Sequence, residues 1–357
     1  MVKIPHSPHG ALTNPAGRYD RQQGEAVDDG WWRDEDLPPL RTSVGKDASR
    51  SVIMRQTSPD IPFDLSINPY RGCEHGCVYC YARPSHNYLG LSSGLDFETR
   101  LFYKPDAARL LAEELRHPAY RCSPIALGTN TDPYQPIERR YRVMRDILET
   151  LWRFRHPLTI TTKSALVLRD LDLLAPMAEA GLVRVGISVT SLDPDLARRL
   201  EPRASAPARR LAALRALNQA GVPTMVMVAP LIPALTDCEL ENILRAAQDC
   251  GTKHAAWILL RLPFDTKDLF EQWLARHRPE RRDHVLSLIR QARGGKLNQS
   301  DFGKRFTGDG PYMAMIRQRF HVACARLGLN GERPPLRTDL FRPPPRPGDQ
   351  LALDLGP

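Results

Sequence analysis

The chain has 357 residues, of which 42% are hydrophobic and 25% are charged, and its formal net charge is +9. This composition is that of a globular protein, and the positive charge permits a polyanionic partner such as nucleic acid without requiring one. Seven cysteines are too few for a disulfide scaffold in a chain of this length, and neither a secretory signal nor an apolar run of roughly 18–20 residues suggests export or a membrane span, so a cytoplasmic protein is expected.

Residues 1–60 predict an irregular N-terminal arm, because they are rich in Pro, Gly, Asp and Arg and lack hydrophobic periodicity. Trp31 and Trp32 interrupt this polar composition. They are expected to anchor the arm on the body of the protein, with covering the mouth of a substrate site as the alternative.

Residues 61–263 alternate between strand-like and helical runs. The predicted strands are short apolar or alternating segments, namely Leu65–Asn68, Ile125–Thr129, Leu158–Thr162, Val183–Thr190, Thr224–Ala229 and Ala256–Leu260. The predicted helices have apolar residues at spacings of three and four, and are clearest over Arg139–Phe154, Ala208–Ala220 and Glu239–Gln248. Six such units predict an α/β protein with a parallel sheet in a partial (β/α)6 TIM-like barrel, and a doubly wound sheet is the alternative.

The C-terminal part of the chain has a different pattern from the barrel. Residues 264–330 predict a helical extension with helices over Lys267–Arg276, Pro279–Arg293 and Pro311–Gly328. Residues 331–357 contain the run RPPPRP and predict an extended, Pro-rich tail.

A cysteine motif follows the first predicted strand, with Cys73, Cys77 and Cys80 at the spacing C-x3-C-x2-C. Three thiolates can hold three irons of a cubic iron–sulfur cluster and leave the fourth iron open to a molecule on which the cluster acts. A zinc site usually has four ligands, often in two pairs, so zinc would require His75 or His86 as the fourth ligand. A cluster with a distant fourth cysteine and a purely structural group of thiols are further alternatives.

The fourth predicted strand, Val183–Thr190, alternates apolar residues with Arg184, Gly186, Ser188 and Thr190. The apolar set should meet the helices, and the second set should line the lumen of the barrel. A lumen lined by small polar side chains leaves room for a ligand, so Ser188 is a candidate ligand-binding residue, unless it only fills the lumen. Parallel strands place such residues at their carboxyl ends.

The C-x3-C-x-aromatic-C motif resembles that of the radical S-adenosylmethionine (radical SAM) superfamily. Residues 68–73 (NPYRGC), 128–138 (GTNTDPYQPIE) and 201–204 (EPRA) resemble the branch around spore photoproduct lyase, which includes uncharacterised proteins described as DNA repair photolyases. This resemblance spans roughly residues 60–330. It implies a [4Fe-4S] cluster whose open iron binds S-adenosylmethionine (SAM), and reductive cleavage of SAM to a 5′-deoxyadenosyl radical that abstracts hydrogen from a substrate.

The resemblance also implies which residues hold SAM. Tyr79 stands where the family has an aromatic residue against adenine, although core packing would also explain it. Asn130 and Asp132 are expected to accept hydrogen bonds from the amino group of SAM, or else to build a turn. Lys163 is expected to pair with the methionyl carboxylate unless it is a solvated surface lysine, and Ser188 to bind that carboxylate or the ribose.

Three hypotheses describe what the protein acts on or binds. The first is a nucleic acid, such as a pyrimidine lesion, although Ile125–Asn130 contains no cysteine where lesion-repairing relatives place a hydrogen donor. The second is a small molecule or a protein residue, and the third is a non-catalytic, zinc-stabilised nucleic-acid-binding protein. Glu201 and Arg203 are expected to bind each other, to reach SAM or to act at a helix start, and Arg261 to meet substrate or cofactor. A monomer served by a reductant such as flavodoxin or ferredoxin is expected.

Overall fold

A computed structural model describes residues 8–19 and 41–345; Trp31, Trp32 and the last part of the tail lie outside these ranges. The strands are β1 Ser43–Lys46, β2 Met54–Arg55, β3 Leu65–Ile67, β4 Tyr70–Arg71, β5 Arg100–Tyr103, β6 Ile125–Leu127, β7 Leu158–Thr162, β8 Val183–Ser188, β9 Thr224–Leu231 and β10 His254–Leu259. The α-helices are α1 Asp96–Thr99, α2 Ala107–Leu115, α3 Glu138–Tyr141, α4 Val143–Arg153, α5 Leu171–Glu179, α6 Pro194–Leu200, α7 Pro207–Gln219, α8 Leu240–Gln248, α9 Thr266–His277, α10 Arg282–Ala292 and α11 Pro311–Leu327. The 3-10 helices are η2 Arg83–Leu89, η3 Ala165–Asp170, η4 Asp237–Glu239 and η5 Pro279–Arg281.

The main sheet has seven strands in the order β10-β9-β8-β7-β6-β3-β2. Its first six members are parallel to their neighbours, and β2 pairs antiparallel with β3 at the edge. The parallel strands follow one another in chain order, without the reversal of order that defines a doubly wound sheet. The prediction of a partial, six-stranded α/β barrel is therefore confirmed.

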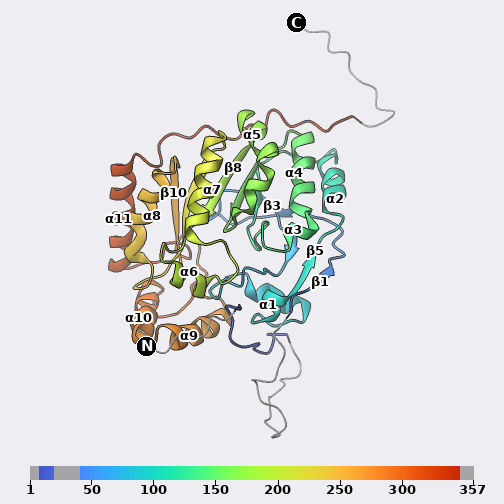
Figure 1. Cartoon of the computed structure of the whole chain (residues 1–357). Coiled ribbons are helices and arrows are strands. Elements are labelled where there is room, and N and C mark those ends of the chain that lie inside the picture. Colours follow the sequence, from blue (N-terminus) through green and yellow to red (C-terminus); the bar gives the residue numbers. More distant parts are fainter. Residues whose placement is uncertain (1–7, 20–40, 346–357) are drawn as a thin grey trace.

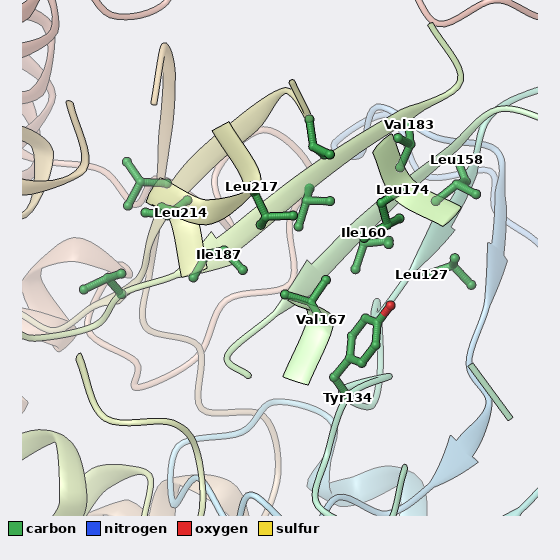
Figure 2. Packing of buried hydrophobic residues seen from close by; sticks show 14 of the residues in the cluster. Leu127, Tyr134, Leu158, Ile160, Val167, Leu174, Val183, Ile187, Leu214 and Leu217 are labelled. Carbon is green, nitrogen blue, oxygen red and sulfur yellow. The ribbon is translucent and has the colours of Figure 1, made fainter. Parts of the chain in front are cut away.

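Helices cover the outer face of this sheet (Figure 1). Val183, Val185 and Ile187 alternate along β8 with at most 1% of each exposed, which confirms the predicted apolar face. Figure 2 shows Ile187 of β8 among the buried side chains that also include Leu174 of α5 and Leu217 of α7. Burial of this interface holds the helices on the strands and leaves the opposite face of the sheet for the lumen.

A second, smaller sheet has the order β1-β5-β4. Its strand β1 lies in the N-terminal arm and pairs parallel with β5, with Ser43 opposite Arg100. The remainder of the described arm has little regular structure apart from β2. The strands β1 and β2 were not predicted, because segments of four and two residues are too short to show a hydrophobic period.

The tail lies across the amino ends of the barrel strands (Figure 1). The amide of Arg337 donates to the carbonyl of Gly181 (3.0 Å), just before β8, and the amide of Arg342 donates to the carbonyl of Phe154 (3.0 Å), just before β7. The carboxyl ends of the strands therefore lie at the end of the sheet away from the tail. In the described ranges, no helix has the length and apolarity that crossing a membrane requires.

Candidate functional site

The cysteine loop, residues 72–80, follows β3 and β4 at the carboxyl end of the first barrel strand. Gly76 has a φ of +67°, and a Cβ added there would lie 2.6 Å from Oε2 of Glu98, so this position requires glycine. Cys73 and Cys77 are buried, whereas Cys80 is half-buried and packs against the hydrophobic groups that contain the other two cysteines. The three predicted ligands are therefore brought together on one tightly folded loop.

The surroundings of these thiols disfavour an isolated thiolate. Burial raises the pKa of Cys77 well above its ordinary value, and the charge of Glu201 adds to this effect, whereas Lys163 opposes it. Burial also raises the pKa of Cys80, and the neighbouring Cys73 raises it further. A thiolate at this place needs a strong neighbouring cation, and bound iron supplies one.

A single metal ion and a cluster differ in how their ligands must be arranged. Over residues 8–19 and 41–345, no group of three or more His, Cys, Asp or Glu side chains is arranged to hold a metal ion. In a cubane cluster each thiolate binds a different iron, so the ligands need not converge on one point.

Asp132 links the cysteine loop to the end of β7. Its carboxylate accepts hydrogen bonds from the hydroxyl of Thr162 (2.6 Å) and the amide of Lys163 (2.7 Å), and Nδ1 of His75 lies 3.4 Å away. Burial alone would raise the pKa of Asp132, but His75 and these donors lower it to about 2. Burial alone would lower the pKa of His75, but the neighbouring side chains of Asp132 and Cys73 raise it to about 9. Both oxygens of Asp132 are thus used by the chain itself.

Asn130 lies in a loop that a neighbouring asparagine organises. The side-chain oxygen of Asn68 accepts the amides of Asn130 (2.9 Å) and Thr131 (3.3 Å). The side-chain amide of Asn130 lies 3.5 Å from the hydroxyl of Ser85, in the 3-10 helix after the cysteine loop. These contacts place Asn130 beside the cysteine loop.

Tyr79 belongs to a buried network at the carboxyl ends of the strands. It is 5% exposed, and its hydroxyl donates to Glu201, which also accepts from Thr190 (2.7 Å) and Arg210. Burial would raise the pKa of Glu201, but the charges of Arg210 and Lys163 lower it to about 2. Nζ of Lys163 lies 5.9 Å from the centre of the Tyr79 ring. Lys163 is therefore a half-buried residue of the site and not a solvated surface lysine.

The expected pairing of Glu201 with Arg203 is wrong. Arg203 lies 3.5 Å from Glu98, and Glu201 pairs with Arg210. The partners lie on different elements, so sequence spacing gave no signal for them. Ser188 is 3% exposed at the end of β8, and its carbonyl accepts from Arg210 (3.0 Å).

Two of the sequence motifs brace the cysteine loop from outside. The side chain of Gln135, which is fully buried, accepts from the amide of Glu74 (2.8 Å) and donates to the carbonyl of Gly72 (3.1 Å). The amide of Arg203 donates to the carbonyl of His75 (3.2 Å). Gln135 was missed as an individual residue, and only its place in the motif of residues 128–138 could have indicated it.

Comparisons with known proteins agree with this arrangement. Residues 67–247 match the model of the Radical SAM superfamily. The chain is 39% identical over 277 residues to an uncharacterized protein of Mycobacterium tuberculosis (strain ATCC 25618 / H37Rv), which covers 77% of this chain and 78% of that protein. It is 32% identical over 176 residues to an uncharacterized protein of Methanocaldococcus jannaschii, covering 48% of this chain and 62% of that one.

Solved structures with a similar fold include mutants of spore photoproduct lyase. One mutant has a TM-score of 0.59 at 18% identity, with 80% of each chain covered. Another, with bound AdoMet and dinucleoside spore photoproduct, has the same TM-score, identity and coverage. Similarity at this level of identity concerns the fold alone.

Proposed function

Because the chain belongs to the radical SAM superfamily and is a radical SAM enzyme, we propose that Cys73, Cys77 and Cys80 bind three irons of a [4Fe-4S] cluster whose fourth iron binds SAM. The observation that carries this proposal is the grouping of two buried thiols, Cys73 and Cys77, with the half-buried thiol of Cys80 on one loop, at the carboxyl ends of parallel strands, next to Lys163. When bound, the cluster supplies the electron that cleaves SAM to methionine and a 5′-deoxyadenosyl radical, which abstracts hydrogen from the substrate.

Each neighbouring residue is proposed to contact a different group of SAM or to position the cysteine loop. Lys163 supplies a positive charge for the methionyl carboxylate, and Ser188, at the end of β8 and three strands along the sheet from β3, is a further partner for the carboxylate or ribose. Asn130 is the proposed partner of the amino group. Asp132 has both oxygens engaged, so its contribution is to hold the cysteine loop against β7. The hydroxyl of Tyr79 is bound by Glu201, and the small exposed part of its ring is the proposed contact for adenine.

A nucleic acid lesion and a small molecule or protein residue are the two substrate classes that we propose. The spore photoproduct bound to a protein of similar fold supports the first class. The second class is supported by the absence of a cysteine from Ile125–Asn130, since Cys122 precedes β6 and thus lies toward its amino end. A reductant such as flavodoxin or ferredoxin is proposed as the electron source, and the protein is proposed to act as a monomer.

Cluster reconstitution tests the proposed ligands. We expect Cys73→Ala, Cys77→Ala and Cys80→Ala each to lose the iron and acid-labile sulfide and to release no detectable 5′-deoxyadenosine from SAM after anaerobic reduction. Cys238→Ala is the matched control, because Cys238 is exposed and lies outside the loop. Release of 5′-deoxyadenosine by the three loop variants would show that the ligand assignment is wrong. Zinc without iron in the wild-type protein would instead favour the zinc-stabilised binding protein.

A further inference from the structure

Arg261 lies beside the cysteine loop without being part of the proposed SAM site. It follows β10 by two residues, at the carboxyl end of the last barrel strand. Its guanidinium carbon lies 5.4 Å from the centre of the Tyr81 ring and 5.1 Å from that of Phe306. Tyr81 directly follows Cys80, and its hydroxyl donates to the carbonyl of Thr129. Arg261 is therefore separated by a single aromatic ring from both the cysteines and the segment that contains Asn130.

The charge of Arg261 has no partner in the described part of the chain. Its buried Nε forms no hydrogen bond, and no carboxylate lies within ion-pair distance of its guanidinium in residues 8–19 and 41–345. Asp60, whose charge does act on Arg261, is engaged by Arg305 at 2.6 Å. A half-buried guanidinium is usually paired or bound to a ligand, because desolvation of an unpaired charge is unfavourable.

A second guanidinium increases the positive potential at this place. Arg293 is 1% exposed and close enough for the charge of Arg261 to act on it. Its hydrogen bonds within the described ranges go to main-chain carbonyls, those of Arg305 (3.2 Å), Leu259 (3.5 Å) and Leu260 (2.5 Å). Carbonyl oxygens orient Arg293 without neutralising it. In residues 8–19 and 41–345, neither of these two neighbouring guanidinium groups forms an ion pair with a carboxylate.

We propose, on the basis of the radical SAM function above, that Arg261 binds a phosphate group of the substrate, and that the substrate is a nucleotide, either free or within a nucleic acid. A guanidinium that lies over two rings presents its fork of donors in a fixed plane, which suits two oxygens of a phosphate. Arg293 adds positive potential behind it. Tyr81 is 45% exposed and offers a ring surface on which a base can stack.

Equilibrium binding to the anaerobically reconstituted protein tests this proposal without requiring turnover. The probes are a deoxynucleoside monophosphate, the corresponding nucleoside, a short single-stranded DNA and SAM. We expect Arg261→Gln to weaken binding of at least one phosphate-bearing probe by about tenfold or more, and Arg261→Lys to weaken it less. Neither variant should change the affinity for the nucleoside or for SAM. If the DNA is the ligand, a plot of the logarithm of its binding constant against the logarithm of the salt concentration should be less steep by about one for Arg261→Gln than for the wild-type protein.

Arg290→Gln is the matched control, because Arg290 is exposed on α10 and its loss changes the net charge equally. A preference for the monophosphate identifies a free nucleotide, and a preference for the DNA identifies a nucleic acid. Equal affinities of Arg261→Gln and Arg290→Gln would overturn the proposal, as would wild-type protein that binds neither phosphate-bearing probe. Weaker binding of SAM alone by the Arg261 variants would assign this residue to the methionyl carboxylate. Release of 5′-deoxyadenosine in the absence of substrate reports separately on the proposed function.

Discussion

Charged side chains buried around the cysteine loop occur in pairs. Arg83 and Glu98 are fully buried, and a guanidinium nitrogen of Arg83 lies 2.5 Å from Oε1 of Glu98. Arg210 forms a similar buried ion pair with Glu201. Removal of one partner from such a pair leaves an uncompensated charge and costs about 3–5 kcal/mol. Substitutions at these four positions therefore report on folding first. Lys163 and Arg261 form no ion pair with a carboxylate in residues 8–19 and 41–345, so they are better probes of ligand binding.

His156 is a buried titratable group far from the site, under the C-terminal tail. It is fully buried, donates from Nδ1 to the carbonyl of Pro157 (2.9 Å), and accepts at Nε2 from the hydroxyl of Tyr120 (2.7 Å). Burial lowers its pKa to about 4, although the bond to Pro157 opposes this effect. The folded protein therefore favours the neutral form of the His156 imidazole.

The free energy of unfolding should depend on pH through His156. An unfolded histidine titrates near 6.5, so the stabilisation is complete above that pH and is lost as the pH falls from about 6.5 to about 4, because the unfolded state takes up the proton first. The loss should reach about 3 kcal/mol. Denaturant unfolding from pH 8 to pH 4, compared with His156→Gln, measures this loss. The same pH slope in both proteins would contradict the assignment.

The cysteine loop is an element that its neighbours hold in place from several sides. The N-terminal segment contributes two main-chain donors, since the amides of Gly10 (3.1 Å) and Ala11 (2.8 Å) donate to Glu98. A Cβ added at Gly10 would lie 1.8 Å from the carbonyl oxygen of Gly76. The arm therefore touches the backbone of the loop so closely that only glycine fits.

Gly10→Ala should separate the arm from the cysteine loop. We expect the free energy of unfolding to fall by about 1–3 kcal/mol, as for other overpacked sites, and the reconstituted cluster to lose iron faster on exposure to a chelator. Gly331→Ala is the control, because no atom lies within 4 Å of its added Cβ. Iron retention in Gly10→Ala equal to that of the control would show that the arm does not support the loop.

The two ends of the barrel have different roles: residues at one end stabilise the fold, and the proposed ligands lie at the other end. The proposed ligands lie at the carboxyl ends of the strands, and the tail covers the amino ends. Phe341 of the tail packs against three rings, with distances between ring centroids of 5.5 Å to Tyr120, 6.5 Å to Phe154 and 5.3 Å to His156. This aromatic group seals the end of the core opposite to the site.

Truncation after Asn330 should destabilise the protein without removing its chemistry. Phe341 is half-buried, so loss of its ring contacts and of the hydrogen bonds along the tail should lower the free energy of unfolding by up to about 3–5 kcal/mol, the range for Phe→Ala in a core. The release of 5′-deoxyadenosine per iron should stay near that of the full chain below the unfolding temperature. Phe341→Ala in the full chain is the comparison. A folded truncated protein that binds iron normally but no longer cleaves SAM would disprove this separation.

Elements with their own hydrophobic period were predictable, and elements held by distant partners were not. The six barrel strands and the helices α4, α7 and α8 lie close to their predicted ranges. The pairing of β1 with β5 joins Ser43 to Arg100 and has no local signal. Helix α5 contains Pro176, which sequence rules treat as a helix stop, and its packing on η3 and β8 overrides that preference.

The sequence by itself determined the order of strands and helices and the three candidate ligands, because hydrophobic period and cysteine spacing are local properties of the chain. Only the tertiary structure decided that Glu201 pairs with Arg210, that Asp132 holds the cysteine loop to β7, and that Arg261 lies beside Tyr81. Those contacts join residues on separate strands and loops, and the closure of the sheet alone brings them within hydrogen-bonding distance or ring contact.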